Sequence, residues 1–123
     1  MQNTITAHIN DRMNLARLFL YDMNKLIDSL TGEFASLPQD KFAGDARKTE
    51  SALRRMEIMK ERWSLLPCEV RRELNGIDWR AAAGRWNRAA SGHDSVDPKY
   101  LWEIITQRLP EMKTKIEDLL KGH

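Results

Sequence analysis

The chain has 123 residues, of which 41% are hydrophobic and 31% carry charges of mixed sign. This composition suits one small globular domain over residues 1–123 and excludes a disordered chain. No apolar run reaches the roughly 18 residues of a membrane-spanning helix, and Cys68 is the only cysteine, which excludes an internal disulfide. The first residues lack the pattern of a signal peptide, so we expect a cytoplasmic protein without membrane association.

The formal net charge is only +2, but it is unevenly distributed. Between Arg47 and Arg88 there are 11 Lys and Arg against 6 Asp and Glu, whereas the preceding part has 4 against 6 and the following part 5 against 6. A basic middle segment is typical of a face that binds RNA or another acidic partner. It is equally typical of a solvated helix surface with ordinary ion pairs, and both interpretations stay open.

The first helix is predicted from about Thr6 to Leu30. Spacings of three and four residues place the following side chains on one apolar stripe: Ile9, Met13, Ala16, Leu20, Met23, Ile27 and Leu30. Three more apolar residues widen this stripe, so that the helix is expected to contact two neighbours: Leu15, Phe19 and Leu26. Thr31-Gly32 predicts its end, with Gly in the left-handed position after the helix.

The second long helix is predicted over Ala46–Leu65, after a start signal at Asp40 or Asp45. Its expected buried face consists of Thr49, Leu53, Met56, Met59, Trp63 and Leu66. A short helical turn is expected after Pro67, because proline suits the first position of a helix, and Asn75-Gly76 should end it.

A third helix is predicted from the N-cap Asp78 to about Ala90, where small alanines allow close approach of another helix. A last helix begins at Asp97-Pro98, an N-cap followed by a proline. Pro110 should kink or restart it. With no strand-like alternation in the sequence, these segments predict an all-α fold, an up-and-down four-helix bundle with an extra short helix.

The residues offer little for cofactor or metal chemistry. His8, His93 and His123 are far apart, and Cys68 has no partner at ligand spacing, so we expect no metal site and a quiet, partly buried thiol. The six glycines are scattered rather than grouped in a phosphate-binding loop, and we expect no cofactor.

Four tryptophans could stack on RNA bases or pack in a core and a dimer interface: Trp63, Trp79, Trp86 and Trp102. Packing is favoured, least strongly for Trp86, which lies among Arg80, Arg85 and Arg88. These residues give a candidate RNA-binding set of Arg80, Arg85 and Trp86. Arg88 and His93 near a helix end could serve RNA cleavage, with His moving a proton and Arg stabilising phosphate charge, although a lone His there is more often a cap or surface residue.

Three stretches carry a resemblance to a known family. They are Ile77-Asp78-Trp79-Arg80-Ala81-Ala82-Ala83-Gly84, Val96-Asp97-Pro98-Lys99-Tyr100-Leu101-Trp102-Glu103-Ile104-Ile105-Thr106, and Leu109-Pro110-Glu111-Met112-Lys113. They resemble the HepT-like family of the HEPN superfamily, small helical proteins of prokaryotic toxin–antitoxin modules. The resemblance implies a homodimeric bundle with metal-independent endoribonuclease activity. It also implies a minimal nucleotidyltransferase antitoxin that adenylylates a motif tyrosine.

The family motif is an Arg, usually followed by Asn, with His five positions after the Arg and Tyr two after the His. Without gaps, these positions are occupied here by Trp86, Asn87, Ser91 and His93, so that only Asn87 matches. A second alignment places Arg88 and His93 on the Arg and His, with Ser95 in place of the tyrosine. It needs an insertion before the motif and a deletion after it, which would rotate a helix face, so the ungapped alignment is favoured.

Three hypotheses follow from these alignments. The first is a HepT-like protein with a degraded ribonuclease site that acts through binding, paired with itself and with a nucleotidyltransferase-type partner. The second is an active endoribonuclease toxin that uses Arg88 and His93, and the third is a non-enzymatic helical adaptor. The catalytic candidates are thus Arg88, His93 and Asn87, while Tyr100 does not align with the family tyrosine. For the homodimer, we expect the helix over residues 78–90 to lie near the two-fold axis.

Overall fold

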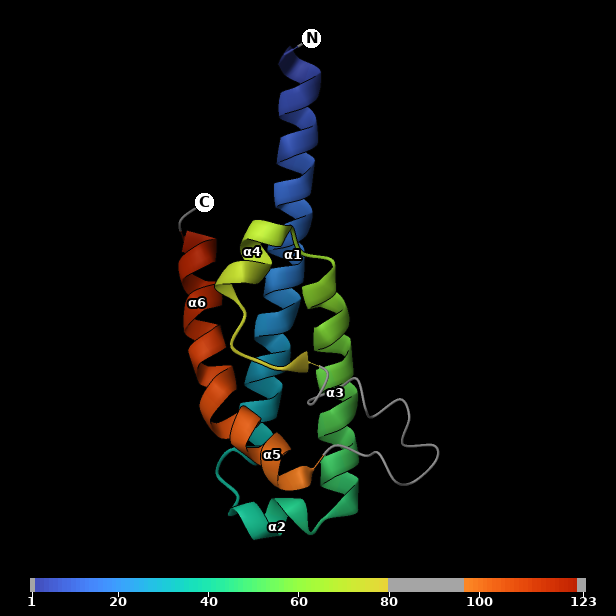
Figure 1. The fold of residues 1–123 in the computed structure, drawn as a ribbon, viewed down its shortest axis with the longest axis vertical. Helices are drawn as coiled ribbons and strands as arrows, with labels where there is room; N and C mark the ends of the chain where they lie inside the picture. Colours follow the sequence, from blue (N-terminus) through green and yellow to red (C-terminus); the bar gives the residue numbers. More distant parts are fainter. Residues whose placement is uncertain (1, 80–96, 122–123) are drawn as a thin grey trace.

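The computed structural model describes residues 2–79 and 97–121, with side chains from residue 13 onward. Its elements are α1 (Gln2–Phe34), α2 (Gln39–Ala43), α3 (Ala46–Ser64), α4 (Cys68–Glu73), α5 (Pro98–Glu103), the π-helical segment η3 (Ile104–Arg108) and α6 (Leu109–Lys121). Figure 1 shows α1, α3 and α6 running along the long axis of the molecule, with α2 across one end. The described part is all-helical and contains no strand, which confirms the predicted fold class. No helix in these ranges is long and apolar enough to cross a membrane.

The first helix, α1, continues past the predicted stop at Thr31-Gly32 and ends at Phe34, so that prediction is wrong. Gly32 stays helical, and the Thr31 hydroxyl donates to the Ile27 carbonyl at 2.9 Å. The reason lies in Phe34, which is buried and packs edge-on against Phe42 of α2, with ring centroids 5.3 Å apart. A glycine inside a helix costs about 1 kcal/mol, whereas burying a phenylalanine contributes about 1.5–3 kcal/mol.

Both predicted start signals before the second long helix are used. Asp40 lies in the first turn of α2, and Asp45 caps α3 by accepting hydrogen bonds from the backbone N–H groups of Arg47 and Lys48 at 3.1 and 3.2 Å. Gly44 joins the two helices in a tight turn, where a Cβ atom would approach the Asp40 carbonyl oxygen to 2.9 Å. Sequence analysis placed the boundaries of α3 to within one residue of Ala46–Ser64.

The chain after α3 turns through Pro67 into the predicted short helix, α4. The end of α4 is held against α3, because the Trp63 indole N–H donates to the Leu74 carbonyl at 3.1 Å. Cys68 is the first residue of α4 and is exposed, so the expected partial burial of this thiol is wrong. A first-turn residue has no preceding helical turn to cover it.

The segments α5, η3 and α6 follow one another directly from Pro98 to Lys121. Pro110 lacks an N–H group, and its ring would clash with the carbonyl four residues earlier, that of Thr106. The π-helical segment immediately before Pro110 adapts the helix to it: the Leu109 N–H donates to the Ile104 carbonyl, five residues back. The apolar stripe therefore continues across the proline.

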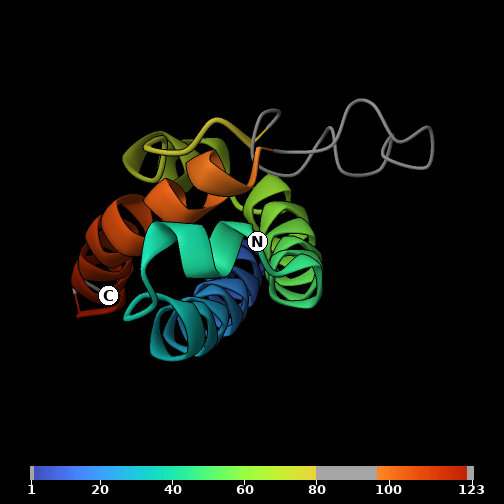
Figure 2. The same ribbon diagram turned by 90° about the horizontal axis from the view of Figure 1, so that it is seen from below.

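The core lies between α1, α3 and the segment of α5, η3 and α6, with α2 closing one end (Figure 2). Its fully buried side chains include Met23, Ile27, Leu30, Leu53, Met56, Met59, Leu101, Ile104 and Ile105. As predicted, α1 contacts two long neighbours, α3 and α6, and Phe19 and Leu26 pack partly against the core. Leu15 does not, because its side chain is 53% exposed. Of the predicted third helix, only the first helical residue, Trp79, lies within the described residues.

Candidate functional site

Every residue that the sequence nominated for catalysis or RNA binding lies outside the described residues: Arg80, Arg85, Trp86, Asn87, Arg88 and His93. The described residues on either side of residues 80–96 are Trp79 and Asp97, and both have defined contacts in the bundle.

The chain just before residue 80 is held in place by aromatic packing. Ile77 and Trp79 are each only 6% exposed, and the Trp79 ring lies 5.8 Å from the Trp63 ring, centroid to centroid, at a tilt of 40°. On Trp63, the guanidinium of Arg71 lies 5.7 Å from the ring centroid, a cation–π contact. The prediction that tryptophans serve packing is thus met for Trp63 and Trp79, which hold the chain against α3.

Two buried donors accompany this packing. The Trp79 Nε1–H and Arg71 Nε–H groups are buried and find no acceptor among the described residues. Leaving such a donor unpaired costs about 1–3 kcal/mol. Two buried hydrogen-bond donors therefore accompany the otherwise apolar contact between Trp63 and Trp79.

The chain just after residue 96 is held in place by a helix cap. The Asp97 carboxylate accepts from the Lys99 backbone N–H at 2.9 Å, and Pro98 occupies the first helical position, as the sequence predicted. One turn later the Trp102 indole N–H donates to the Leu37 carbonyl at 2.9 Å, and Leu101 is fully buried. Since α5 also contacts α3, the described parts of the chain on either side of residues 80–96 both contact this helix.

Within the described part of the basic middle segment, most charges on α3 are already paired. Ion pairs join Lys48 to Asp45 at 3.1 Å, Arg54 to Glu50 at 3.1 Å, Arg55 to Glu33 at 2.7 Å and Arg62 to Asp22 at 3.3 Å. Such a surface favours the interpretation of α3 as an ion-paired helix face. The remaining support for an RNA-binding set therefore comes from Arg80 and Arg85, outside these ranges.

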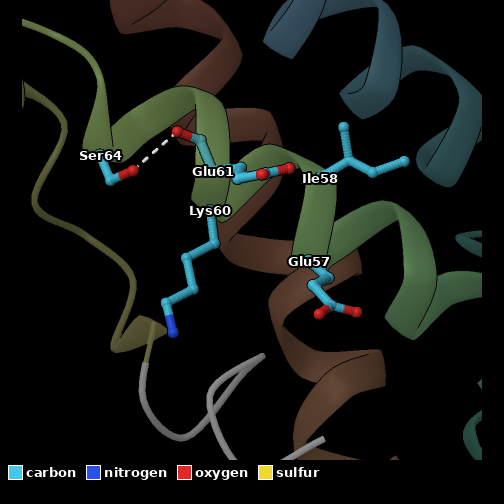
Figure 3. Close-up of a pocket in the computed structure, with 5 residues that line it drawn as sticks. All are labelled: Glu57, Ile58, Lys60, Glu61 and Ser64. Carbon is cyan, nitrogen blue, oxygen red and sulfur yellow. Dashed lines mark hydrogen bonds between the residues drawn. The ribbon is translucent and has the colours of Figure 1, made fainter. Parts of the chain in front are cut away.

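The outer side of α3 is hollowed in two places. Figure 3 shows the larger hollow, lined by Glu57, Ile58, Lys60, Glu61 and Ser64. Its polar groups are carboxylates, one ammonium and a hydroxyl that donates to the Glu61 carbonyl at 2.7 Å. The second is lined by Arg47, Glu50, Ser51, Arg54 and Arg55. Sequence analysis did not point to these surfaces, since no chemical motif marks them.

Metal ligands do not converge within residues 2–79 and 97–121, where no group of three or more His, Cys, Asp or Glu side chains could hold an ion. The exposed Cys68 has one polar neighbour, the Arg72 guanidinium, 3.7 Å from its sulfur. The described residues thus provide a helical scaffold that holds Trp79 and Asp97, the residues on either side of 80–96.

This arrangement defines a class of protein: a small all-helical bundle whose nominated functional residues all fall between two anchored residues, Trp79 and Asp97. Comparison of sequences specifies the family. The model of the family described as "Ribonuclease HepT-like" matches residues 23–119, so the chain belongs to the HepT-like family. This confirms the resemblance inferred from the sequence.

Relatives with related names support the assignment. "Putative RNase TTE0752" of Caldanaerobacter subterraneus subsp. tengcongensis is 23% identical over 109 residues, which cover 89% of this chain and 97% of the relative. "Probable ribonuclease HepT" of Thermococcus cleftensis is 27% identical over 97 residues, covering 79% and 86%. "Putative RNase MJ1216" of Methanocaldococcus jannaschii is 22% identical over 105 residues, covering 85% and 87%. No solved structure gave a significant match.

Proposed function

We propose that this chain is the HepT-like subunit of a prokaryotic toxin–antitoxin-type module, that its ribonuclease site is degraded, and that it acts through binding. Its membership of the HepT-like family supports a ribonuclease ancestry. The loss of activity is argued from the residues at the motif positions, where only Asn87 agrees with the family pattern.

The observation that carries this proposal is that the chain is held in place on both sides of residues 80–96, at Trp79 and at Asp97. Trp79 is packed into the bundle and Asp97 caps α5, so positions between them can be counted from either side. The ungapped count puts Trp86 on the arginine and Ser91 on the histidine of the motif. The alternative count shifts the motif by two residues, which turns a helix by about 200°. The alternative alignment needs both an insertion before the motif and a deletion after it, so the ungapped count is favoured.

The chemistry follows from these substitutions. A serine in place of the histidine has no group that titrates near neutral pH, so it cannot serve as the general base. A tryptophan in place of the arginine cannot stabilise phosphate charge, although it can stack on a base. With Arg80 and Arg85 nearby in the sequence, the segment retains residues suited to bind RNA without cleaving it.

We further propose two protein partners, a second copy of this chain and a nucleotidyltransferase-type antitoxin. His93 occupies the position of the motif tyrosine, so the hydroxyl that would be adenylylated is lost there. We therefore expect the antitoxin to bind this chain without modifying that position. Co-purification with the product of a neighbouring nucleotidyltransferase gene, followed by intact mass measurement, tests both points, and an adenylyl group on His93 would contradict the second.

The decisive experiment is an RNA cleavage and binding assay with EDTA present, on wild type, His93→Ala and Arg85→Ala, with Lys99→Ala as a matched control outside the segment. We expect no cleavage by any protein and weaker RNA binding only for Arg85→Ala. Cleavage by wild type that disappears in His93→Ala would contradict the degraded site. Unchanged RNA binding in Arg85→Ala would remove the binding role.

One observation favours a second candidate, an active metal-independent endoribonuclease toxin. Arg88 and His93 stand five residues apart, the spacing of the motif arginine and histidine. In this case expression should arrest growth, and Arg88→Ala should relieve the arrest. Harmless expression with intact cellular RNA would exclude it, and absence of a neighbouring nucleotidyltransferase gene as well would favour a non-enzymatic helical adaptor.

A further inference from the structure

The partly buried arginines of the described residues have oxygen acceptors, with one exception. Arg17 donates to the Leu120 carbonyl at 3.1 Å, and Arg55 and Arg62 form ion pairs with carboxylates at 2.7 and 3.3 Å. Arg71, on α4, donates to no acceptor among the described residues, and no ion pair joins it to a carboxylate there. Its guanidinium stays charged at neutral pH and is therefore available to an external anion.

Stacking, rather than hydrogen bonding, holds Arg71 in position. Its guanidinium carbon lies 5.7 Å from the centroid of the Trp63 ring. That ring is itself held, because its N–H donates to the Leu74 carbonyl at 3.1 Å and the Trp79 ring packs against it at 5.8 Å. The Arg71 Nε–H is buried and unpaired, whereas the two terminal nitrogens, also without an acceptor among the described residues, remain accessible to solvent.

This arrangement is typical of a binding group. Leaving a buried donor unpaired destabilises the free protein, and natural proteins accept such losses mainly where a residue serves function. A stacked guanidinium that already has one orientation loses little conformational freedom when it binds, and its planar fork donates two parallel hydrogen bonds to an oxyanion. Arg71 is thus preorganised to bind an oxyanion.

Lys60 supplies a second positive charge on the same side of α3. It lies three residues before Trp63, so the two side chains are neighbours on the helix surface. Figure 3 shows the Lys60 side chain pointing toward the olive segment that leads to residue 79, whereas the carboxylates of Glu57 and Glu61 point in other directions. No ion pair joins Lys60 to a carboxylate in the described part of the chain. Its charge is therefore free to act beside Trp63.

The charges and donors together favour a terminal phosphate group as the ligand. A phosphate monoester carries a charge of about −1.5 to −2 near neutral pH and has three acceptor oxygens. Two positive charges match it, and the two terminal nitrogens of Arg71 with the Lys60 ammonium provide one donor group for each oxygen. A carboxylate or an internal phosphodiester carries a single negative charge and has two such oxygens, so that one donor group would stay unused.

We propose that Arg71 and Lys60 form a subsite beside Trp63 that binds the terminal phosphate of an RNA end or of a free nucleotide. This inference rests on the RNA-binding role in the proposed function and specifies a chemical group that the chain recognises. Trp79, which packs on Trp63, directly precedes Arg80 of the candidate RNA-binding set, so one bound RNA can contact both.

The first test compares one short, internally labelled single-stranded RNA with a 5′-phosphate, with a 3′-phosphate and with hydroxyl groups at both ends, by fluorescence anisotropy in EDTA. Wild type should bind one of the phosphorylated forms at least about fivefold more tightly, because charge-assisted hydrogen bonds are strong. Arg71→Met keeps the apolar stem over Trp63 and should abolish this preference, and Lys60→Met should reduce it. Arg72→Met, on the same helix, is the matched control and should retain the preference.

Two further measurements distinguish binding from a structural role. Arg71→Lys keeps the charge but lacks the planar fork, so it should retain part of the preference, and added salt should weaken the preference of wild type. The Tm of Arg71→Met should stay close to that of Arg72→Met. A clearly lower Tm for Arg71→Met, with an equal loss of affinity for all three RNAs, would mean a structural role and overturn the proposal.

Competition identifies the source of the phosphate. AMP should displace the phosphorylated RNA in a manner that depends on Arg71, whereas adenosine should not. If wild type bound AMP in this way but no RNA, the subsite would stand with a free nucleotide as its ligand, and only the RNA-binding role would fail. Binding of neither ligand would overturn the subsite. Stronger competition by a glutamate-rich peptide than by AMP would assign Arg71 to protein carboxylates and also overturn it.

The RNA assays separate this subsite from the proposed function. Equal binding of all three RNAs by wild type, with weaker binding by Arg85→Ala, would remove only the subsite. A preference for a phosphorylated end in a protein that also cleaves RNA would remove only the degraded ribonuclease site.

Discussion

The segment of α5, η3 and α6 and the pair α1–α3 use their apolar residues differently. From Pro98 to Lys121, the large apolar side chains of the main stripe are at most 3% exposed: Leu101, Ile104, Ile105, Leu109, Met112 and Ile116. The helices α1 and α3 also bury an apolar stripe, but they expose four large apolar side chains besides, and a fifth, Leu65, directly follows α3. The stripe accounts for the core in both regions. Among the described residues, large exposed apolar side chains therefore occur only on α1, on α3 and directly after α3.

The largest effect expected from this comparison is on stability. Ile105→Ala removes a fully buried side chain next to the π-helical segment and should lower the free energy of unfolding by about 2–5 kcal/mol. Leu18→Ala truncates a side chain that is 59% exposed and should change the free energy of unfolding of the monomer by about 0.5 kcal/mol or less. Urea unfolding at low micromolar concentration measures both. Equal losses of stability in the two variants would mean that the buried and the exposed apolar side chains contribute alike to the fold.

A smaller effect is expected where polar groups hold the last helix in place. Trp102→Phe removes the indole donor to the Leu37 carbonyl and leaves that oxygen unpaired, at a cost of about 1–3 kcal/mol. Tyr100→Phe is the matched aromatic control and should cost about 0.5 kcal/mol or less. The two variants are compared by thermal and urea unfolding. If the control were as damaging, the loss would come from packing rather than from the hydrogen bond.

The Asp97 cap should contribute less to the free energy of unfolding than the Trp102 hydrogen bond. Asp97→Ala removes the acceptor for the Lys99 backbone N–H and should destabilise the protein by about 0.5–2 kcal/mol, whereas Asp97→Asn keeps an acceptor and should retain most of this stability. Urea unfolding of the three proteins measures the order. Equal losses in both variants would show that the carboxylate has another role.

The smallest effect concerns the start of α3 and depends on pH. Hydrogen bonds from the Lys48 backbone N–H, the Lys48 side chain and the Arg47 N–H hold the pKa of Asp45 below its ordinary value. A carboxylate whose pKa is lowered by folding contributes stability above its unfolded pKa, and this contribution is lost as the pH falls through the folded pKa.

Asp45→Asn should therefore be slightly less stable than wild type at pH 6, with a gap that shrinks as the pH falls below about 4. Asparagine is itself a good N-cap residue, so the charge is tested separately from the cap. Unfolding curves at pH 6, 4 and 2.5 measure the gap. A gap that stays constant across this range would show that the charge contributes nothing.

Sequence patterns predicted the capped starts of α3 and α5 better than the bounds of α1, which begins at Gln2 rather than at Thr6. Asp45 and Asp97 cap their own helices through local hydrogen bonds, so the start is encoded within three residues. The end of α1 is decided by Phe34, whose partner Phe42 lies on another helix. Gly32 was a local stop signal that a tertiary contact overrode.

The candidate site was predicted only in part. Three stretches of the sequence indicated the family, which the comparisons confirm, and Trp79 and Asp97 lie where helix starts were predicted. The identity of the acting residues between them stays a prediction. Leu15 was expected to widen the buried stripe and is instead 53% exposed, whereas Ile58 and Leu65 lie outside the predicted buried face of the second long helix and are exposed.

By itself, the sequence determined the all-helical class, the buried stripes of α1, α3 and the last helix, and the caps that start α3 and α5, because periodicity and capping act over a few residues. Tertiary structure alone decided where α1 ends, how Trp63 holds Trp79, and which apolar side chains remain exposed. Those outcomes depend on which helix lies beside which, and the spacing of residues along one helix carries no information about its neighbours.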